Sequence, residues 1–249
     1  RCIAQSDDAD TKVNMNKSTI ALMIFAFAGC GSTPAASVDA SPTSDAPACT
    51  LPATQRYLPL ATGNQWTYNI TPAGGGTTVM KKNSVEAFED VGAAKAGIMA
   101  YRVRAERSDG VTVDWQRETC EGVIREREQT FTLAGVKATE QYYTPNKLRL
   151  DESVAHLTMG ATWISTYQEH QIDLVTNVET VVAKSDRWTV VATNVPVTVP
   201  AGTFNCLQIT KAGVATGTVD KTFYFALGVG KVKEVGKQIE ELAAYTVQP

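Results

Sequence analysis

The feature that most constrains this chain is a period-two alternation of apolar and polar residues, broken by turn residues roughly every ten positions. In the stretch AYRVRAERSDGVTVDWQRET, Tyr101 and Val103 share one face of an extended segment, and the alternation resumes at Val111 and Val113. Between the two segments lies the Asp-Gly pair at 109–110, a strong signal for a two-stranded hairpin. Residues 100–119 are therefore predicted to form two antiparallel strands.

The same pattern continues over the rest of the chain. GVIREREQTFTLAGVKATEQYY breaks at Ala134-Gly135, and KTFYFALGVGKVKEV contains two short strands around Leu227-Gly228. Segment 237–245 is the best helix candidate, but it is equally compatible with a last strand. We therefore predict an all-β domain, an antiparallel sandwich or an open or half barrel of roughly ten or more strands, with little helix outside the leader described next.

The stretch MNKSTIALMIFAFAGCGS, which begins at Met15, has a polar, positively charged start followed by nine apolar residues at 20–28. A helix of nine residues is about 14 Å long, too short to cross a hydrocarbon layer of about 30 Å, so it indicates a secretory signal peptide. The sequence Phe27-Ala28-Gly29-Cys30 resembles the lipobox of bacterial lipoproteins. That resemblance implies cleavage before Cys30 and acylation of this residue, which would provide a durable membrane anchor.

Four parts of the chain are expected. Residues 1–14 contain three aspartates that do not suit a signal peptide and are interpreted as an upstream extension outside the mature protein; residues 15–29 are the signal peptide. Residues 30–48 combine the lipid-anchored cysteine with a flexible tether rich in Ser, Pro and Ala, and residues 49–249 form a single β-rich domain. Gly31 is not the aspartate that favours inner-membrane retention, so the resemblance places the anchor in the outer membrane, with the domain in the periplasm or at the cell surface.

Three blocks of the domain carry a second resemblance: YLPLATGNQWTY at 57–68, VPAGTFNCLQI at 199–209 and FYFALGVGKVK at 223–233. In order and spacing they resemble a loosely defined group of uncharacterised bacterial surface lipoproteins. The chain departs from that group at Ala226-Leu227, where the group often has Ala-Pro. The resemblance implies a β-rich extracytoplasmic domain and transfers no catalytic residue.

A short signature, L-x-x-G-x-x-W, occurs twice, at 60–66 and 157–163. Each glycine can supply a turn with positive φ, after which the tryptophan opens a strand and closes one end of the core. Two readings are open: a duplicated half-domain, or two tryptophans used in the same way as core plugs.

The cysteines of an exported protein are candidates for disulfides. With Cys30 acylated and Cys2 in the upstream extension, Cys49, Cys120 and Cys206 remain. The prediction is a Cys120–Cys206 disulfide, with Cys49 pairing with either of them as the alternative. A loop of about 87 residues closed in this way would stabilise the fold by roughly 4–5 kcal/mol in the chain-entropy model.

Motifs for catalysis, metals and nucleotides are missing from the sequence: it contains no G-x-S-x-G, H-E-x-x-H, P-loop or C-x-x-C. His156 and His170 have no metal-site spacing, and Asp151 and Glu152 offer only a generic carboxylate pair. The charged stretch RETCEGVIREREQ is interpreted as a solvated sheet face. No catalytic residue, metal or cofactor is predicted, and the domain is not expected to be an enzyme.

The net charge of −3 and the pI of about 5.5 argue against nucleic acid as a partner. A binding or structural domain that meets an envelope protein is expected, with Tyr142 and Tyr143 as a candidate contact surface. The alternative is a carrier or chaperone for an apolar ligand, such as a lipid or acyl chain, in a half-barrel cavity; a hydrolase is the third hypothesis. A dry cavity above about 300 Å³ would favour the carrier.

Overall fold

The computed structural model describes residues 51–248. The predicted signal peptide, the Cys30 anchor, the tether and Cys49 lie outside the described residues.

The described residues form twelve strands and three short 3₁₀ turns. The first six strands are β1 (Gln65–Pro72), β2 (Val79–Asp90), β3 (Met99–Arg107), β4 (Gly110–Thr119), β5 (Gly122–Phe131) and β6 (Lys137–Asp151). The remaining six are β7 (Thr162–Ile172), β8 (Glu179–Val199), β9 (Gly202–Gly213), β10 (Val219–Ala226), β11 (Gly230–Val235) and β12 (Gln238–Thr246). The 3₁₀ turns are η1 (Ala53–Gln55), η2 (Ala93–Lys95) and η3 (Val154–His156). Within 51–248, no helix has the length and apolar character needed to cross a membrane.

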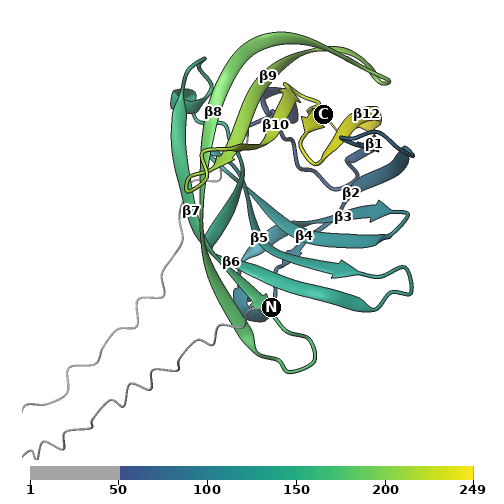
Figure 1. The fold of residues 1–249 in the computed structure, drawn as a ribbon, viewed down its shortest axis with the longest axis vertical. Coiled ribbons are helices and arrows are strands. Elements are labelled where there is room, and N and C mark those ends of the chain that lie inside the picture. Colours follow the sequence, from purple (N-terminus) through teal and green to yellow (C-terminus); the bar gives the residue numbers. More distant parts are fainter. Residues whose placement is uncertain (1–50, 249) are drawn as a thin grey trace, which may run out of the picture. The chain divides into compact units, whose positions relative to one another are not determined.

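Each strand pairs antiparallel with its neighbours in sequence, and β12 pairs with β1, so the sheet closes into a barrel (Figure 1). The all-β prediction is confirmed, but the predicted sandwich or half barrel is corrected to a closed barrel. The correction comes from segment 237–245, which is a strand rather than a helix. Its pairing with β1 runs from Gln65↔Thr246 to Pro72↔Gln238 and leaves neither strand as an edge.

The inward-facing residues change character along the strands. In β10 the inward positions run from Lys221 through Phe223 to Phe225, and in β9 they run from Lys211 to Leu207. Because turns of an up-and-down barrel alternate between its two ends, these charged residues all lie toward one end. We call this the charged end; it carries the β1–β2, β3–β4 and β9–β10 turns. The opposite end is called the apolar end.

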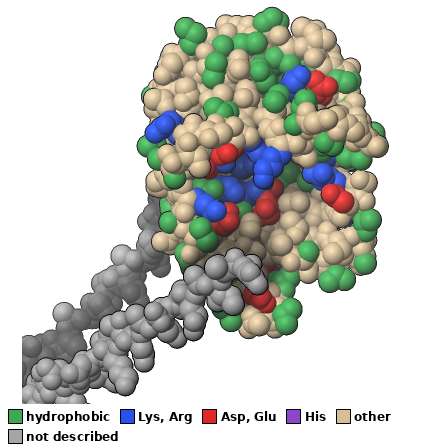
Figure 2. Space-filling model, viewed as in Figure 1, with side chains coloured by type: hydrophobic (Ala, Val, Ile, Leu, Met, Phe, Trp, Pro, Cys, Tyr) green, Lys and Arg blue, Asp and Glu red, His purple; other side chains and the backbone are tan. Residues whose placement is uncertain are grey.

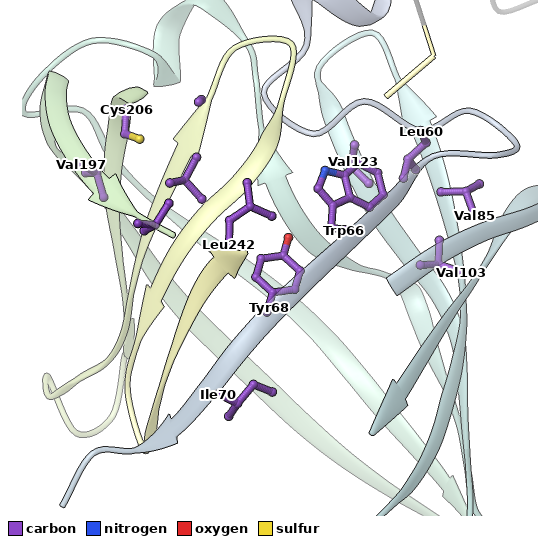
Figure 3. Packing of buried hydrophobic residues seen from close by; sticks show 13 residues of the cluster. Leu60, Trp66, Tyr68, Ile70, Val85, Val103, Val123, Val197, Cys206 and Leu242 are labelled. Carbon is purple, nitrogen blue, oxygen red and sulfur yellow. The ribbon is translucent and has the colours of Figure 1, made fainter. Parts of the chain in front are cut away.

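The apolar end is packed with side chains. Its main cluster surrounds Trp66, Tyr68, Val123 and Leu242 (Figure 3), and the last two side chains are fully buried. The Trp66 indole donates a hydrogen bond to the Val229 carbonyl at 2.6 Å, so its polar atom is satisfied within the cluster.

The chain entering β1 crosses the apolar end. Arg56 is 1% exposed and donates to the Glu152 carboxylate and to the Thr119 carbonyl, both at 2.9 Å. The Leu60 amide donates to the Glu118 carboxylate at 2.8 Å. These acceptors belong to β4 and to the segment after β6, so residues 53–60 tie several strands together at this end.

The repeated signature has the same backbone role at both sites. Gly63 and Gly160 have φ of +96° and +86°, in the left-handed region that favours glycine. The Gly63 amide donates to the Val85 carbonyl and the Val85 amide to the Asn64 carbonyl. The same pair of bonds joins Gly160 and the residue after it to Val190. Each copy therefore lays a turn onto a neighbouring strand before its own strand begins.

Candidate ligand-binding lumen

The charged end of the barrel is hollow. A cavity of about 400 Å³, called the lumen here, lies inside the sheet, and Figure 2 shows a hollow in which Lys and Arg side chains gather with some acidic ones. Its lysines are Lys81, Lys147, Lys211, Lys221 and Lys231, and its arginines are Arg107, Arg125 and Arg149. Its acidic residues are Asp114, Glu128, Asp186, Glu234 and Glu240. The wall therefore has more cations than carboxylates in a chain whose net charge is −3.

Lys231 is at the centre of one ion-pair network in the lumen. Its ammonium lies 2.7 Å from Glu240 and also binds Glu234, and Lys81 binds Glu240 as well. Although burial alone would raise it, Lys231 and Lys81 hold the pKa of Glu240 well below its usual range. Burial and the like charge of Lys231 lower the pKa of Lys81 to about 7. The carboxylate thus keeps its charge near neutral pH, and Lys81 is the group that loses a proton first.

Arg125 organises a second network. It donates to Asp114 at 2.7 Å and also binds Glu128. Nearby, Lys147 lies 3.7 Å from Glu169 and 4.8 Å from the centre of the Tyr143 ring. Burial and then Arg125 lower the pKa of Lys147 to about 8. Arg125 on β5 and Lys147 on β6 therefore lie close enough for their like charges to repel each other.

Arg149 differs from the other cations of the lumen. The other seven each have a carboxylate within 4.0 Å. Among residues 51–248, Arg149 has neither such a partner nor a hydrogen bond, and its Nε atom is buried. Burial and then Arg125 lower the pKa of this guanidinium, which nevertheless keeps its proton.

A second hollow adjoins the lumen. It has a volume of about 1120 Å³ and lies against β6, β7, β8 and the β9–β10 turn. Lys147, Asp186 and Lys211 border both hollows. Beyond Thr144↔Gln168 the β6–β7 pairing stops, so these strands separate beside the outer hollow. We call it the vestibule, because it gives the lumen a route to solvent.

The stretch RETCEGVIREREQ is not the solvated face that its charge alternation suggested. A bulge in the β5–β6 pairing lies between Arg125 and Arg127 and sends them to opposite sides of the sheet. Arg125 lines the lumen, while Arg127 lies over the Trp115 ring at 4.7 Å. Glu126 is 1% exposed and binds Lys95 at 3.0 Å and Arg117 at 2.9 Å.

The two tyrosines of the predicted contact surface point to opposite sides of β6. Tyr143 is fully buried beside the Arg125–Lys147 network. Tyr142 is half-buried on the outer face, stacks on His170 at 4.2 Å and donates to Glu179 at 2.8 Å. Only Tyr142 can therefore contribute to an outer contact surface.

His170 also contacts Thr144, whose hydroxyl lies 2.6 Å from its Nε2, while its Nδ1 binds Glu179. This hydroxyl–imidazole–carboxylate chain was not anticipated from the sequence, because its members lie on three strand segments. It lies on the outer face of β6 and β7, away from the lumen wall.

The other titratable candidates have structural partners. The Asp151 carboxylate accepts from Ser153 and lies 2.8 Å from His156, which stacks on Trp163 at 4.2 Å. Glu152 binds Arg56, so the two adjacent carboxylates do not form a glycosidase-like pair. Among the described residues, no group of His, Cys, Asp and Glu is arranged to hold a metal ion.

The predicted Cys120–Cys206 disulfide is wrong. Cys206 is a free thiol, fully buried in the apolar cluster. It lies on β9 and packs in the apolar cluster with Val197 and Ala226, and burial raises its pKa to about 11. The residue therefore acts as a small apolar side chain.

Sequence reasoning missed the lumen as a whole. Its charged residues are spread over β2 to β6 and β8 to β12, one or two per strand, and each resembles an ordinary solvent-facing residue in an alternating strand. One local signal was available: Lys221 is followed two residues later, on the same face of its strand, by the aromatic Phe223.

No family model matches the chain, and no curated protein sequence matches it. Two solved structures align with it. One is a protein from Parabacteroides distasonis assigned as a lipoprotein, at 11% identity, a TM-score of 0.30, and coverage of 77% of this chain and 99% of that one. The other is a protein from Bacteroides fragilis assigned as exported and as having a YmcC-like fold, at 12% identity, a TM-score of 0.29 and the same coverage. Likeness at this level carries no conclusion about function.

Proposed function

We propose that this protein is an extracytoplasmic, lipid-tethered binding protein that takes a small polar ligand into the lumen without turning it over. The observation that carries the proposal is the charged, hollow end of a barrel whose other end is filled. Its volume, about 400 Å³, falls in the usual range of about 300–1,000 Å³ for small-molecule sites. Trp188 and Phe223 line it beside the charges, which suits a ligand with polar groups on a compact body.

The lumen is large enough for an apolar carrier, but charged side chains line its wall beside the apolar ones. Lys231, Glu240 and Arg125 are fixed ion-paired groups in the wall, and an acyl chain entering the lumen would desolvate them without replacing water as a hydrogen-bonding partner. The lining therefore does not favour a lipid or acyl-chain carrier.

The test is a thermal-shift screen of the purified protein with neutral sugars, amino acids, small anions, polyamines and laurate. A ligand that binds only the folded state at 100 times its Kd adds about 2.7 kcal/mol of stability. At least one polar class should raise the Tm, and Ala105→Phe, which fills the lumen, should abolish the shift. A shift with laurate alone, or no shift with any class, would overturn the proposal.

Binding without turnover has its own test. The Thr144–His170–Glu179 chain is the arrangement among residues 51–248 closest to a nucleophile with its base. Wild-type protein should leave ester, glycoside and peptide substrates intact. Hydrolysis that disappears in His170→Ala would show that the protein is an enzyme.

The lipid tether is proposed from the lipobox resemblance at Cys30. Cys30→Ser should abolish metabolic labelling with palmitate and leave the precursor unprocessed. Sucrose-gradient fractionation should find the wild-type protein with the outer membrane. Unchanged labelling of the variant would exclude this anchor.

A second candidate function is contact with an envelope protein through the β7–β8 hairpin. Val175 and Val178 at its tip are 94% and 59% exposed, and Tyr142 donates a hydrogen bond to Glu179, the first residue after the turn. Val175→Ser with Val178→Ser should reduce capture of an envelope partner in a pull-down without lowering the Tm. Equal capture would remove this surface from consideration.

A further inference from the structure

Arg149 occupies a special backbone position. In the β5–β6 pairing Val123 faces Leu150 and Ile124 faces Leu148, so Arg149 is the extra residue of a β-bulge. Bulges redirect side chains and are frequent next to functional sites. Here the bulge lies where the apolar cluster ends and the lumen begins, so the guanidinium forms part of the floor of the lumen.

The acidic groups near Arg149 cannot serve as its partners. Asp114, Glu128 and Glu234 influence it electrostatically but lie beyond ion-pair distance. The first two already bind Arg125, and the third binds two lysines. Arg149 is half-buried and its Nε atom is fully buried without a partner, and a guanidinium withdrawn from water in this way without a counter-charge is costly.

We propose that Arg149 anchors an anion-binding subsite on the floor of the lumen, which takes the carboxylate or phosphate group of a small ligand. This inference rests on the proposed function of the lumen and gives the chemical class of its ligand. The planar guanidinium matches either group through two parallel hydrogen bonds. Lys147 and Arg125 add positive charge beside it, and the vestibule gives the anion a route inward.

The neutral part of the ligand has a place as well. Phe223, Phe225 and Trp188 line the same cavity and form one stacked series, with ring centres 5.8 Å apart between neighbours. A compact body attached to the anionic group would lie against these rings. The subsite therefore suits a small organic anion rather than a bare inorganic ion.

Titration calorimetry of the purified protein with citrate and with inorganic phosphate at low salt tests the subsite. At least one of them should bind at one saturable site per molecule. Arg149→Gln should weaken its affinity about tenfold or more, equivalent to at least 1.4 kcal/mol. The matched control is Arg104→Gln, which removes the same charge from the outer face of β3 and should change the affinity by less than about threefold.

A second measurement needs no variant. Phenylglyoxal should modify Arg149 in the native protein, and citrate should slow that reaction, as followed by peptide mapping. Equal affinity of Arg149→Gln and wild type, protection absent at Arg149, or no saturable binding of either anion would each overturn the subsite. If a neutral or cationic ligand still binds and Ala105→Phe abolishes its binding, the subsite fails while the proposed function stands. If nothing binds, both fail.

Discussion

The two ends of this barrel use the same inward-facing positions in opposite ways. At the apolar end, Trp66, Leu242 and their neighbours fill the interior, and residues 53–60 cover it. At the charged end, lysines, arginines and carboxylates project inward and leave a cavity between them. Buried ion pairs add little net stability compared with apolar packing. We therefore infer that the apolar end supplies most of the stability, and ligand recognition at the charged end is the function that we propose for the lumen.

The largest expected effect comes from the ion pair that fastens residues 53–60. Arg56→Met leaves Glu152 buried without its cation and should lower the free energy of unfolding by about 3–5 kcal/mol. At the charged end, Lys221→Met should lower the free energy of unfolding by less than about 1 kcal/mol. The Lys221 side chain is more than a third exposed, and Glu234 still has its ion pair with Lys231 in this variant. Urea unfolding measures both. Equal losses would remove the distinction between the ends.

The next effect concerns apolar packing. Leu242→Ala creates a cavity in the main cluster and should cost about 2–5 kcal/mol. Thr112→Ala, on the lumen wall, should cost less than about 1 kcal/mol, because its side chain borders space that is already empty. A loss at Thr112 as large as that at Leu242 would mean that the charged end is packed too.

A smaller effect is expected from pH. The folded-state pKa of Lys81, about 7, lies below the unfolded value, so the folded protein binds this proton less tightly. Its unfavourable contribution is fully present below pH 7 and is relieved as pH rises toward the unfolded value. Between pH 7 and 9 the free energy of unfolding should rise by about 2 kcal/mol more in wild type than in Lys81→Met.

Lys81→Met does not leave Glu240 without a cation, because Lys231 still lies 2.7 Å from this carboxylate. A difference between the two stability–pH curves can therefore be assigned to the proton of Lys81. Parallel stability–pH curves for wild type and Lys81→Met would contradict the assignment of this titration to Lys81.

The smallest effect is a difference in chemical accessibility. Cys206 is fully buried at the apolar end, and burial raises its pKa to about 11, so iodoacetamide should modify it only after unfolding. Peptide mapping of native and urea-unfolded protein measures this. Rapid modification of the native protein would show that the apolar end opens readily.

Much of the fold could be predicted from local pattern. The hairpin around Asp109-Gly110 and the strands on either side of Leu227-Gly228 follow from alternation and turn chemistry, and the structure confirms both. Closure of the barrel could not be predicted, because it depends on the pairing of β1 with β12, which are distant in sequence. Alternation of apolar and polar residues indicates that the two faces of a strand differ, but it does not indicate which face points into the barrel.

That ambiguity explains the errors at the site. In β4 the apolar Val113 and Trp115 face outward under the β2–β3 connection, while the polar Thr112 and Asp114 face the lumen. A sequence pattern assigns such polar residues to solvent. The inward orientation of Arg149 could not be predicted for a further reason. Its position on a bulge depends on the register between β5 and β6, which no local sequence signal specifies.

One pair of substitutions tests the central difference between the ends most directly. Val123, fully buried in the apolar cluster, and Ala105, on the lumen wall, are each replaced by phenylalanine. Val123→Phe should overpack the cluster and lower the free energy of unfolding by about 1–3 kcal/mol. Ala105→Phe should place its ring in the lumen, change stability by less than about 0.5 kcal/mol and abolish ligand binding. Equal destabilisation by the two substitutions, measured by urea unfolding, would contradict a hollow charged end.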